Sequence, residues 1–138
     1  MARLSKLSLC AVALMSAAAL PAAGATTLVG HVAAKAGPQN ARVWIIQLLN
    51  TGTNTASSAR FTGLTLTQTS GAACTPVVTP PSSYPVALGD IAPSAAAGAN
   101  FTIDFTGCPN NAAFILAVPF SADSGATTGT VVRYHQYR

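Results

Sequence analysis

Few side chains in this 138-residue sequence have the chemistry needed for acid–base catalysis or metal binding. The sequence contains two histidines, three aspartates and no glutamate. A hydrolase needs a base with an oriented partner, and a zinc or calcium site needs several ligands at suitable spacing. Neither pattern occurs, because Asp90, Asp104 and Asp123 belong to separate segments. We therefore predict no catalytic residue, no metal site and no cofactor.

The two histidines lie near opposite ends of the segment that follows residue 25. His31 and His135 would form a two-histidine metal site if the fold placed the first and last strands side by side. No third ligand accompanies them, whereas protein zinc sites use at least three protein ligands. We favour the interpretation that both histidines are partly exposed strand residues.

The cysteines outside the first 25 residues are Cys74 and Cys108. An even number of cysteines in an exported chain is typical of a disulfide framework. A reactive thiol or a metal-binding pair are the alternatives, but neither cysteine has a second ligand at a zinc-type spacing. We predict a disulfide between Cys74 and Cys108.

Residues 1–25 have the pattern of a secretory signal peptide. Arg3 and Lys6 precede an apolar run over residues 7–20, and small residues before Thr26 supply a cleavage site. A membrane anchor is the alternative, but the run is too short to span a bilayer comfortably. We expect this helical segment to be removed, which would make the product secreted, periplasmic or attached to the cell surface.

The predicted mature chain, residues 26–138, carries few charges. Five basic side chains and three aspartates give it a net charge of +2. Binding to nucleic acid requires a dense basic patch, so no nucleic-acid partner is expected. The chain is rich in Thr, Ser, Gly, Pro and Val and poor in charged helix formers, which favours an all-β fold. No other segment is apolar for long enough to predict a membrane span after signal cleavage.

Residues 41–52 form the longest apolar run outside the N-terminal segment. Trp44, Ile46, Leu48 and Asn50 share one parity, so they would point to one face of a strand. The run ends at an Asn-Thr-Gly turn. We interpret it as the central core strand, with Trp44 packed in the core and not exposed as a sugar-stacking platform.

Shorter strands are predicted around this one. Alternation is clearest in residues 100–106, whereas residues 93–98 and 121–129 read as a connector and a flexible hairpin loop. Further strands are expected at residues 26–34, 59–69, 85–91, 112–121 and 130–137. About seven antiparallel strands in one domain of residues 26–138 fit an immunoglobulin-like β-sandwich.

Three local patterns carry a family resemblance. They are the apolar strand Ile46–Gly52 with its Asn-Thr-Gly ending, the segment Leu88–Pro93 before a linker of small residues, and the alternating segment Phe101–Phe105. Together they resemble the bacterial immunoglobulin-like domains of the CARDB type, although Ser94 stands where that family often has glycine. The resemblance implies a bacterial surface protein associated with cell adhesion, and it implies no catalytic residues because the family shares none.

The central strand lacks the polar face that a sandwich strand usually has. Val43, Ile45 and Leu49 lie opposite its core residues, so either another element covers them or they form an exposed apolar patch. Tyr134 and Tyr137 lie among polar and basic residues near residue 138 and are further candidates for surface contacts. These five residues are the predicted contact surface, for self-association or for an unknown protein or glycan at the cell surface.

The predicted function is that of an exported, non-enzymatic domain acting in cell-surface adhesion, scaffolding or protein–protein contact. A carbohydrate-binding module is one alternative, and it would need two or three exposed aromatic side chains on one face. A pilus-type structural subunit completed by a donated strand is the other.

Overall fold

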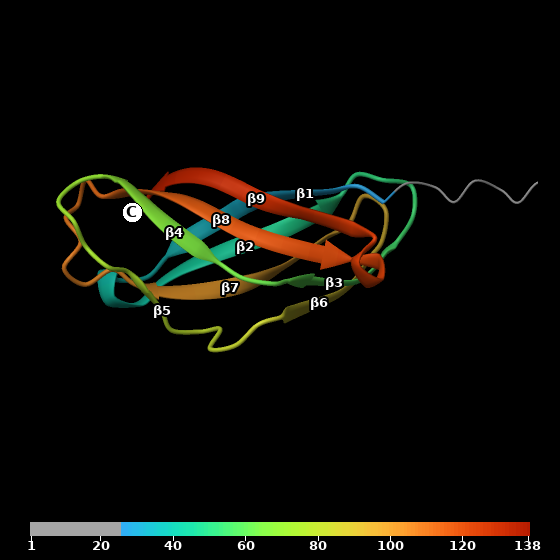
Figure 1. Ribbon diagram of the computed structural model, residues 1–138, viewed down its shortest axis with the longest axis horizontal. Coiled ribbons are helices and arrows are strands. Elements are labelled where there is room, and N and C mark those ends of the chain that lie inside the picture. Colours follow the sequence, from blue (N-terminus) through green and yellow to red (C-terminus); the bar gives the residue numbers. More distant parts are fainter. Residues whose placement is uncertain (1–25) are drawn as a thin grey trace, which may run out of the picture.

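The computed structural model describes residues 26–138, which form two antiparallel β-sheets packed face to face, with the strands along the long axis of the molecule (Figure 1). The first sheet, here the β2 sheet, has the order β1 (Leu28–Ala36), β2 (Arg42–Asn50), β7 (Ala96–Asp104) and β5 (Val77–Val78). The second, the β8 sheet, contains β9 (Thr127–Gln136), β8 (Ala113–Ala122), β4 (Thr65–Ser70), β3 (Ala56–Phe61) and β6 (Val86–Ile91). The predicted all-β sandwich is confirmed.

Within the β8 sheet, β9 pairs with one side of β8, and β4 and β3 follow one another along its other side. Strand β6 pairs with β3 at the edge. Two short 3₁₀ helices, η1 (Gln39–Ala41) and η2 (Asp123–Gly125), precede β2 and β9. Residues 1–25, and with them the predicted signal peptide, lie outside the described residues. No helix within residues 26–138 is long and apolar enough to cross a membrane.

The core lies between the sheets and is organised around β2, which runs between β1 and β7. Trp44, Ile46 and Leu48 are completely buried, as the parity of the sequence predicts. Burial of side chains of this size stabilises the fold by about 1.5–3 kcal/mol each. Strand β7 with the residue after it, and the strands of the facing β8 sheet, contribute other large buried side chains, which include Phe61, Phe101, Phe105, Phe114, Ile91, Ile103, Leu116 and Val118.

Asn50, at the end of β2, is the fully buried polar residue of this core. Its side-chain amide donates hydrogen bonds to the carbonyl oxygens of Asn54 at 2.7 Å and Ile91 at 2.8 Å. Its side-chain oxygen accepts a hydrogen bond from the N–H of Gly52 at 2.9 Å. One side chain thereby holds the turn after β2 against the end of β6, so the Asn-Thr-Gly sequence fixes a contact between the two sheets.

The strand boundaries differ from the sequence prediction in three places. The segment 59–69 is divided into β3 and β4. The predicted connector 93–98 is partly strand, because β7 begins at Ala96 and extends the pairing with β2. This extension requires Gly98, since a Cβ there would lie 2.5 Å from the carbonyl oxygen of Ile46. The predicted loop 121–129 is shorter than expected, because η2 and the first residues of β9 occupy it.

The predicted disulfide between Cys74 and Cys108 is present, with its Cα atoms 5.1 Å apart. It closes a loop with a sequence separation of 34 residues and ties the irregular segment before β5 to the turn after β7. A cross-link of that span stabilises a fold by roughly 3–4 kcal/mol in the chain-entropy description. Cys108 is buried, so the bond forms part of the core at this end of the sandwich.

Replacing Asn50 with alanine should destabilise the protein by about 2–4 kcal/mol, because the carbonyl of Ile91 and the N–H of Gly52 would lose their partner. Urea denaturation measures this change in the free energy of unfolding. Asn100→Ala on the exposed outer side of β7 is the matched control and should change stability by less than about 0.5 kcal/mol. Equal effects of the two substitutions would contradict the role assigned to Asn50.

Candidate contact surfaces

The outer face of the β8 sheet carries a cluster of exposed apolar side chains. Ile115 and Tyr134 are direct cross-strand partners on β8 and β9, and Val132 is paired with Ala117 one step along the same face. The exposed fractions are 38% for Ile115, 51% for Val132 and 62% for Tyr134. We call these three residues the Tyr134 patch. Large exposed apolar side chains that lie together are typical of contact sites.

The cross-strand neighbours of the Tyr134 patch are uncharged, although the exposed Arg133 lies between Val132 and Tyr134 along β9. On β4, the exposed residues Thr65 and Thr67 pair with Ala117 and Ile115, so two threonines flank the patch. On its other side along β9, Thr130 pairs with Pro119. The rows that surround the patch therefore present hydroxyl and methyl groups but no formal charge.

The outer face of the β2 sheet contains the other part of the predicted contact surface. Val43, Ile45 and Leu49 are half-buried there, and no further layer of residues 26–138 lies over them. Their cross-strand partners on β1 and β7 are mostly short or polar: Ala36 and Thr102, Ala34 and Asn100, and Val29 and Ala96. These neighbours cover only the sides of the β2 residues, so Val43, Ile45 and Leu49 form an apolar row among short and polar side chains.

The two tyrosines of the predicted surface have different environments. Tyr134 is exposed, whereas Tyr137 is only 2% exposed and lies in the core. The ring of Tyr137 stacks on Phe105 with a centroid distance of 5.1 Å, and its hydroxyl donates a hydrogen bond to Asn110 at 2.8 Å. Sequence reasoning missed Ile115 and Val132, although both lie in segments that it predicted to be strands.

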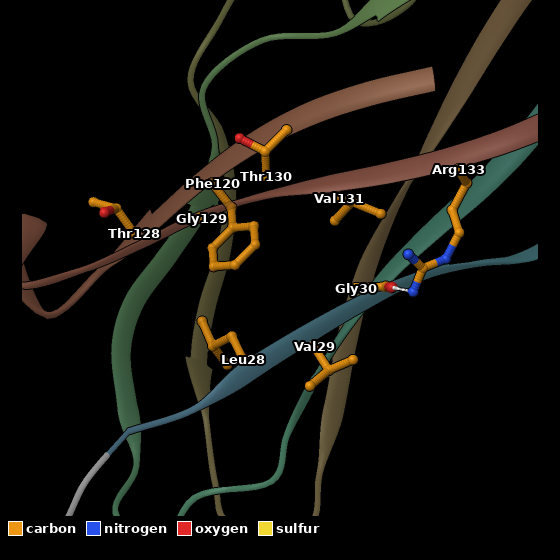
Figure 2. A pocket seen from close by; sticks show the side chains of 9 residues that line it. All are labelled: Leu28, Val29, Gly30, Phe120, Thr128, Gly129, Thr130, Val131 and Arg133. Atoms are coloured by element: carbon orange, nitrogen blue, oxygen red, sulfur yellow. Dashed lines mark hydrogen bonds between the residues drawn. The ribbon is translucent and has the colours of Figure 1, made fainter. Parts of the chain in front are cut away.

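A groove lies along the side of the sandwich between β1 and β9 (Figure 2). It has a volume of about 290 Å³ and is lined at its apolar end by Leu28 and Phe120, whose side chains point toward each other. Leu28 lies by the beginning of β9, while Lys35 contacts its end, so the two strands run in the same direction. Each is the edge of its sheet on this side and pairs with only one strand.

Two cations bridge this side of the sandwich. Arg133 on β9 donates a hydrogen bond to the carbonyl oxygen of Gly30 at 2.6 Å, as Figure 2 shows. In the opposite direction, Lys35 on β1 donates to the carbonyl oxygen of Gln136 at 2.7 Å. Lys35 also lies 5.6 Å from the centroid of the Trp44 ring, a cation–π geometry. Inward-pointing charges of this kind protect sheet edges from pairing with other chains.

The histidines do not form a common site. His31 is paired with Gln47 and lies on the outer face of the β2 sheet. His135 instead packs edge-on against Trp44 with a centroid distance of 5.6 Å. Burial, and then the nearby charges of Lys35 and Arg133, hold the pKa of His135 below its usual value.

The side chains of the three aspartates accept hydrogen bonds from backbone N–H groups. Strand β3 contains an irregularity after Ala56 that frees two successive N–H groups from the ladder. The N–H of Ser57 donates to the carboxylate of Asp123, and the N–H of Ser58 donates to that of Asp90, each at 2.8 Å. Asp104 accepts the N–H of a residue two positions further along the chain. Within residues 26–138, no group of three or more His, Cys, Asp or Glu side chains is placed to hold a metal ion.

Comparison with known proteins gives no match to a family model, to a curated protein or to a solved structure. The resemblance to CARDB-type domains therefore rests on the three sequence motifs described above.

Replacing Gly30 with alanine should destabilise the protein by about 1–3 kcal/mol, because the new Cβ would lie 1.9 Å from Cγ2 of Val131 and push the two edge strands apart. Chemical denaturation measures the change, and Val131→Ala in the same chain should relieve part of it. Gly63→Ala is the matched control, since its Cβ would lie 3.5 Å from Pro119, an ordinary contact. The explanation fails if the effects of Gly30→Ala and Val131→Ala on the free energy of unfolding are simply additive.

Acid should weaken the fold partly through Asp123. Hydrogen bonds from Thr127 and then from the backbone of Ser57 lower the pKa of this carboxyl in the folded protein. A folded pKa below the unfolded value of about 3.9 gives stability that is present above that pH and is lost as the pH falls through the folded pKa. The gain is small, about 0.5–1 kcal/mol, because solvent screens this exposed group.

Unfolding of the wild type and of Asp123→Asn, followed from pH 6 to about pH 2, tests this assignment. The stability difference between the two proteins should be largest at pH 6 and should shrink toward the acid end. A difference that is independent of pH would assign the effect of the substitution to something other than the carboxylate charge.

Proposed function

We propose that residues 26–138 form an exported, non-enzymatic, immunoglobulin-like domain that acts in cell-surface adhesion, scaffolding or protein–protein contact. The disulfide supports export, because disulfides persist mainly in oxidising compartments. The signal-peptide pattern of residues 1–25 supports it independently. A secreted, periplasmic or surface location follows from both.

The strand neighbours support the immunoglobulin-like assignment. The order β1–β2–β7 is that of strands A, B and E in such a sandwich, and β9 and β8 next to β3 and β4 correspond to strands G, F and C. The departures are the division of strand C into two parts, the short β5, and the additional strand β6, which follows β5 in the chain and pairs with β3 at the edge of the β8 sheet. The pilus-type alternative gains no support, because β1 is already paired with β2 along its length.

The observation that carries the contact function is the Tyr134 patch, whose cross-strand neighbours are uncharged. A charged partner surface would lose its hydration against this face without gaining a counter-charge, which is unfavourable. The chain itself offers a second apolar row, since Val43, Ile45 and Leu49 lie half-buried on the outer face of the β2 sheet. We infer that the partner is a second copy, whose β2 sheet packs on the β8 sheet of the first.

Sedimentation velocity over a range of protein concentrations tests this contact. Tyr134→Lys should weaken self-association, because it introduces a charge into the centre of the patch, and Ile45→Lys should do the same from the other face. Ser83→Lys in an exposed loop is the matched control and should leave association unchanged. A wild-type protein that remains monomeric at millimolar concentration would overturn the assignment of a second copy as partner.

Mixing Tyr134→Lys with Ile45→Lys distinguishes a contact between unlike sheet faces from a contact between like faces. Each variant keeps the face that the other has lost, so a contact between unlike faces should give a one-to-one dimer in the mixture. A contact between like faces would give no such dimer.

A further inference from the structure

A second cavity, of about 340 Å³, lies at the end of the sandwich where β9 finishes. It is lined by Gly37, Gln39, Arg42, Tyr137 and Arg138. Two of these five residues are arginines, and neither outer sheet face contributes to it. The cavity is therefore separate from the proposed contact surface.

Cations are concentrated around this cavity. Of the five basic side chains in residues 26–138, Arg42 and Arg138 line it, and Lys35 reaches the same segment of β9. Arg42 donates hydrogen bonds to the carbonyl oxygens of Tyr137 at 3.2 Å and Gly37 at 2.6 Å. Lys35 donates to the carbonyl oxygens of Gln136 at 2.7 Å and Arg138 at 2.6 Å. The two carbonyl oxygens that accept from Arg42 leave its charge unneutralised.

The aspartates of the described chain make their hydrogen bonds elsewhere. Asp90 and Asp123 hold the irregularity in β3, and Asp104 accepts the N–H of Thr106. The basic groups consequently act on one another. Burial, and then the charge of Arg42, lower the pKa of Lys35.

Donor groups remain available for a ligand in the cavity. A guanidinium group has five N–H donors, and the bonds of Arg42 to Tyr137 and Gly37 occupy only two of them. The other cavity-lining guanidinium belongs to Arg138, which is exposed. Two guanidinium groups at one cavity suit a ligand with several oxygen acceptors, since their planar donors match carboxylate and phosphate oxygens.

We propose that this cavity binds an oxyanion, a carboxylate or phosphate group of a small molecule or surface polymer, between the guanidinium groups of Arg42 and Arg138. Lys35 contributes positive charge behind them. The ligand would replace water at the two arginines and would bring negative charge to them. The site does not require self-association through the sheet faces.

Nitrogen-15 correlation spectra of the purified protein, titrated separately with inorganic phosphate and with acetate, test the proposal. Sodium chloride keeps the ionic strength constant, so general screening does not change during the titration. Saturable shifts should appear at residues 37–42 and 137–138, and the tighter of the two anions identifies the kind of ligand. Arg138→Gln should weaken binding by about tenfold or more, because a charge-assisted contact is lost.

Arg42→Gln should weaken binding as well, but this residue also holds the end of β9 and its loss changes the fold locally. The exposed Arg138 is therefore the decisive position, and Arg60→Gln on the distant β3 is the control that should bind both anions like the wild type. Unsaturable shifts spread over the surface, or equal binding by Arg138→Gln and the wild type, would overturn the proposal.

Discussion

The sandwich depends on the burial of one side of β2. Trp44, Ile46 and Leu48 fill the space between the sheets, and Asn50 ends the same row with all its side-chain groups hydrogen-bonded. A buried amide of this kind tolerates few arrangements, because each lost partner is costly in the absence of water. The apolar row supplies most of the stabilisation. The amide of Asn50 fixes the contact between the turn after β2 and the end of β6.

The core around β2 is built from apolar side chains and one amide. The few charged residues lie at the edges and ends of the sheets. Lys35 and Arg133 lie on the two edge strands of the groove and bind main-chain carbonyls across it. On the sheet faces, the cross-strand partners of Ile45 and Tyr134 carry no charge. This separation gives the molecule two kinds of surface: uncharged faces suited to another uncharged sheet, and a basic end suited to an oxyanion.

The sequence predicts those features that depend on local alternation. The inward row of β2, the alternation around Phe101 and the Cys74–Cys108 bridge all follow from parity or cysteine count. Features set by contacts between distant segments do not follow. The sequence predicts Tyr137 to be a surface residue, yet it stacks on Phe105, which lies just after β7 and more than thirty positions earlier in the chain. The bond of Arg133 to Gly30 likewise depends on how the sheets meet at their open side.

The parallel course of β1 and β9 has a mechanical consequence. The described chain enters at one end of the long axis, and β9 finishes at the other (Figure 1). Tension applied along that axis, through Leu28 and Arg138, would load the β1–β2 and β8–β9 ladders lengthwise. The hydrogen bonds of each ladder would then have to break together and not one after another. A domain built in this way resists stretching along the line that joins its two ends.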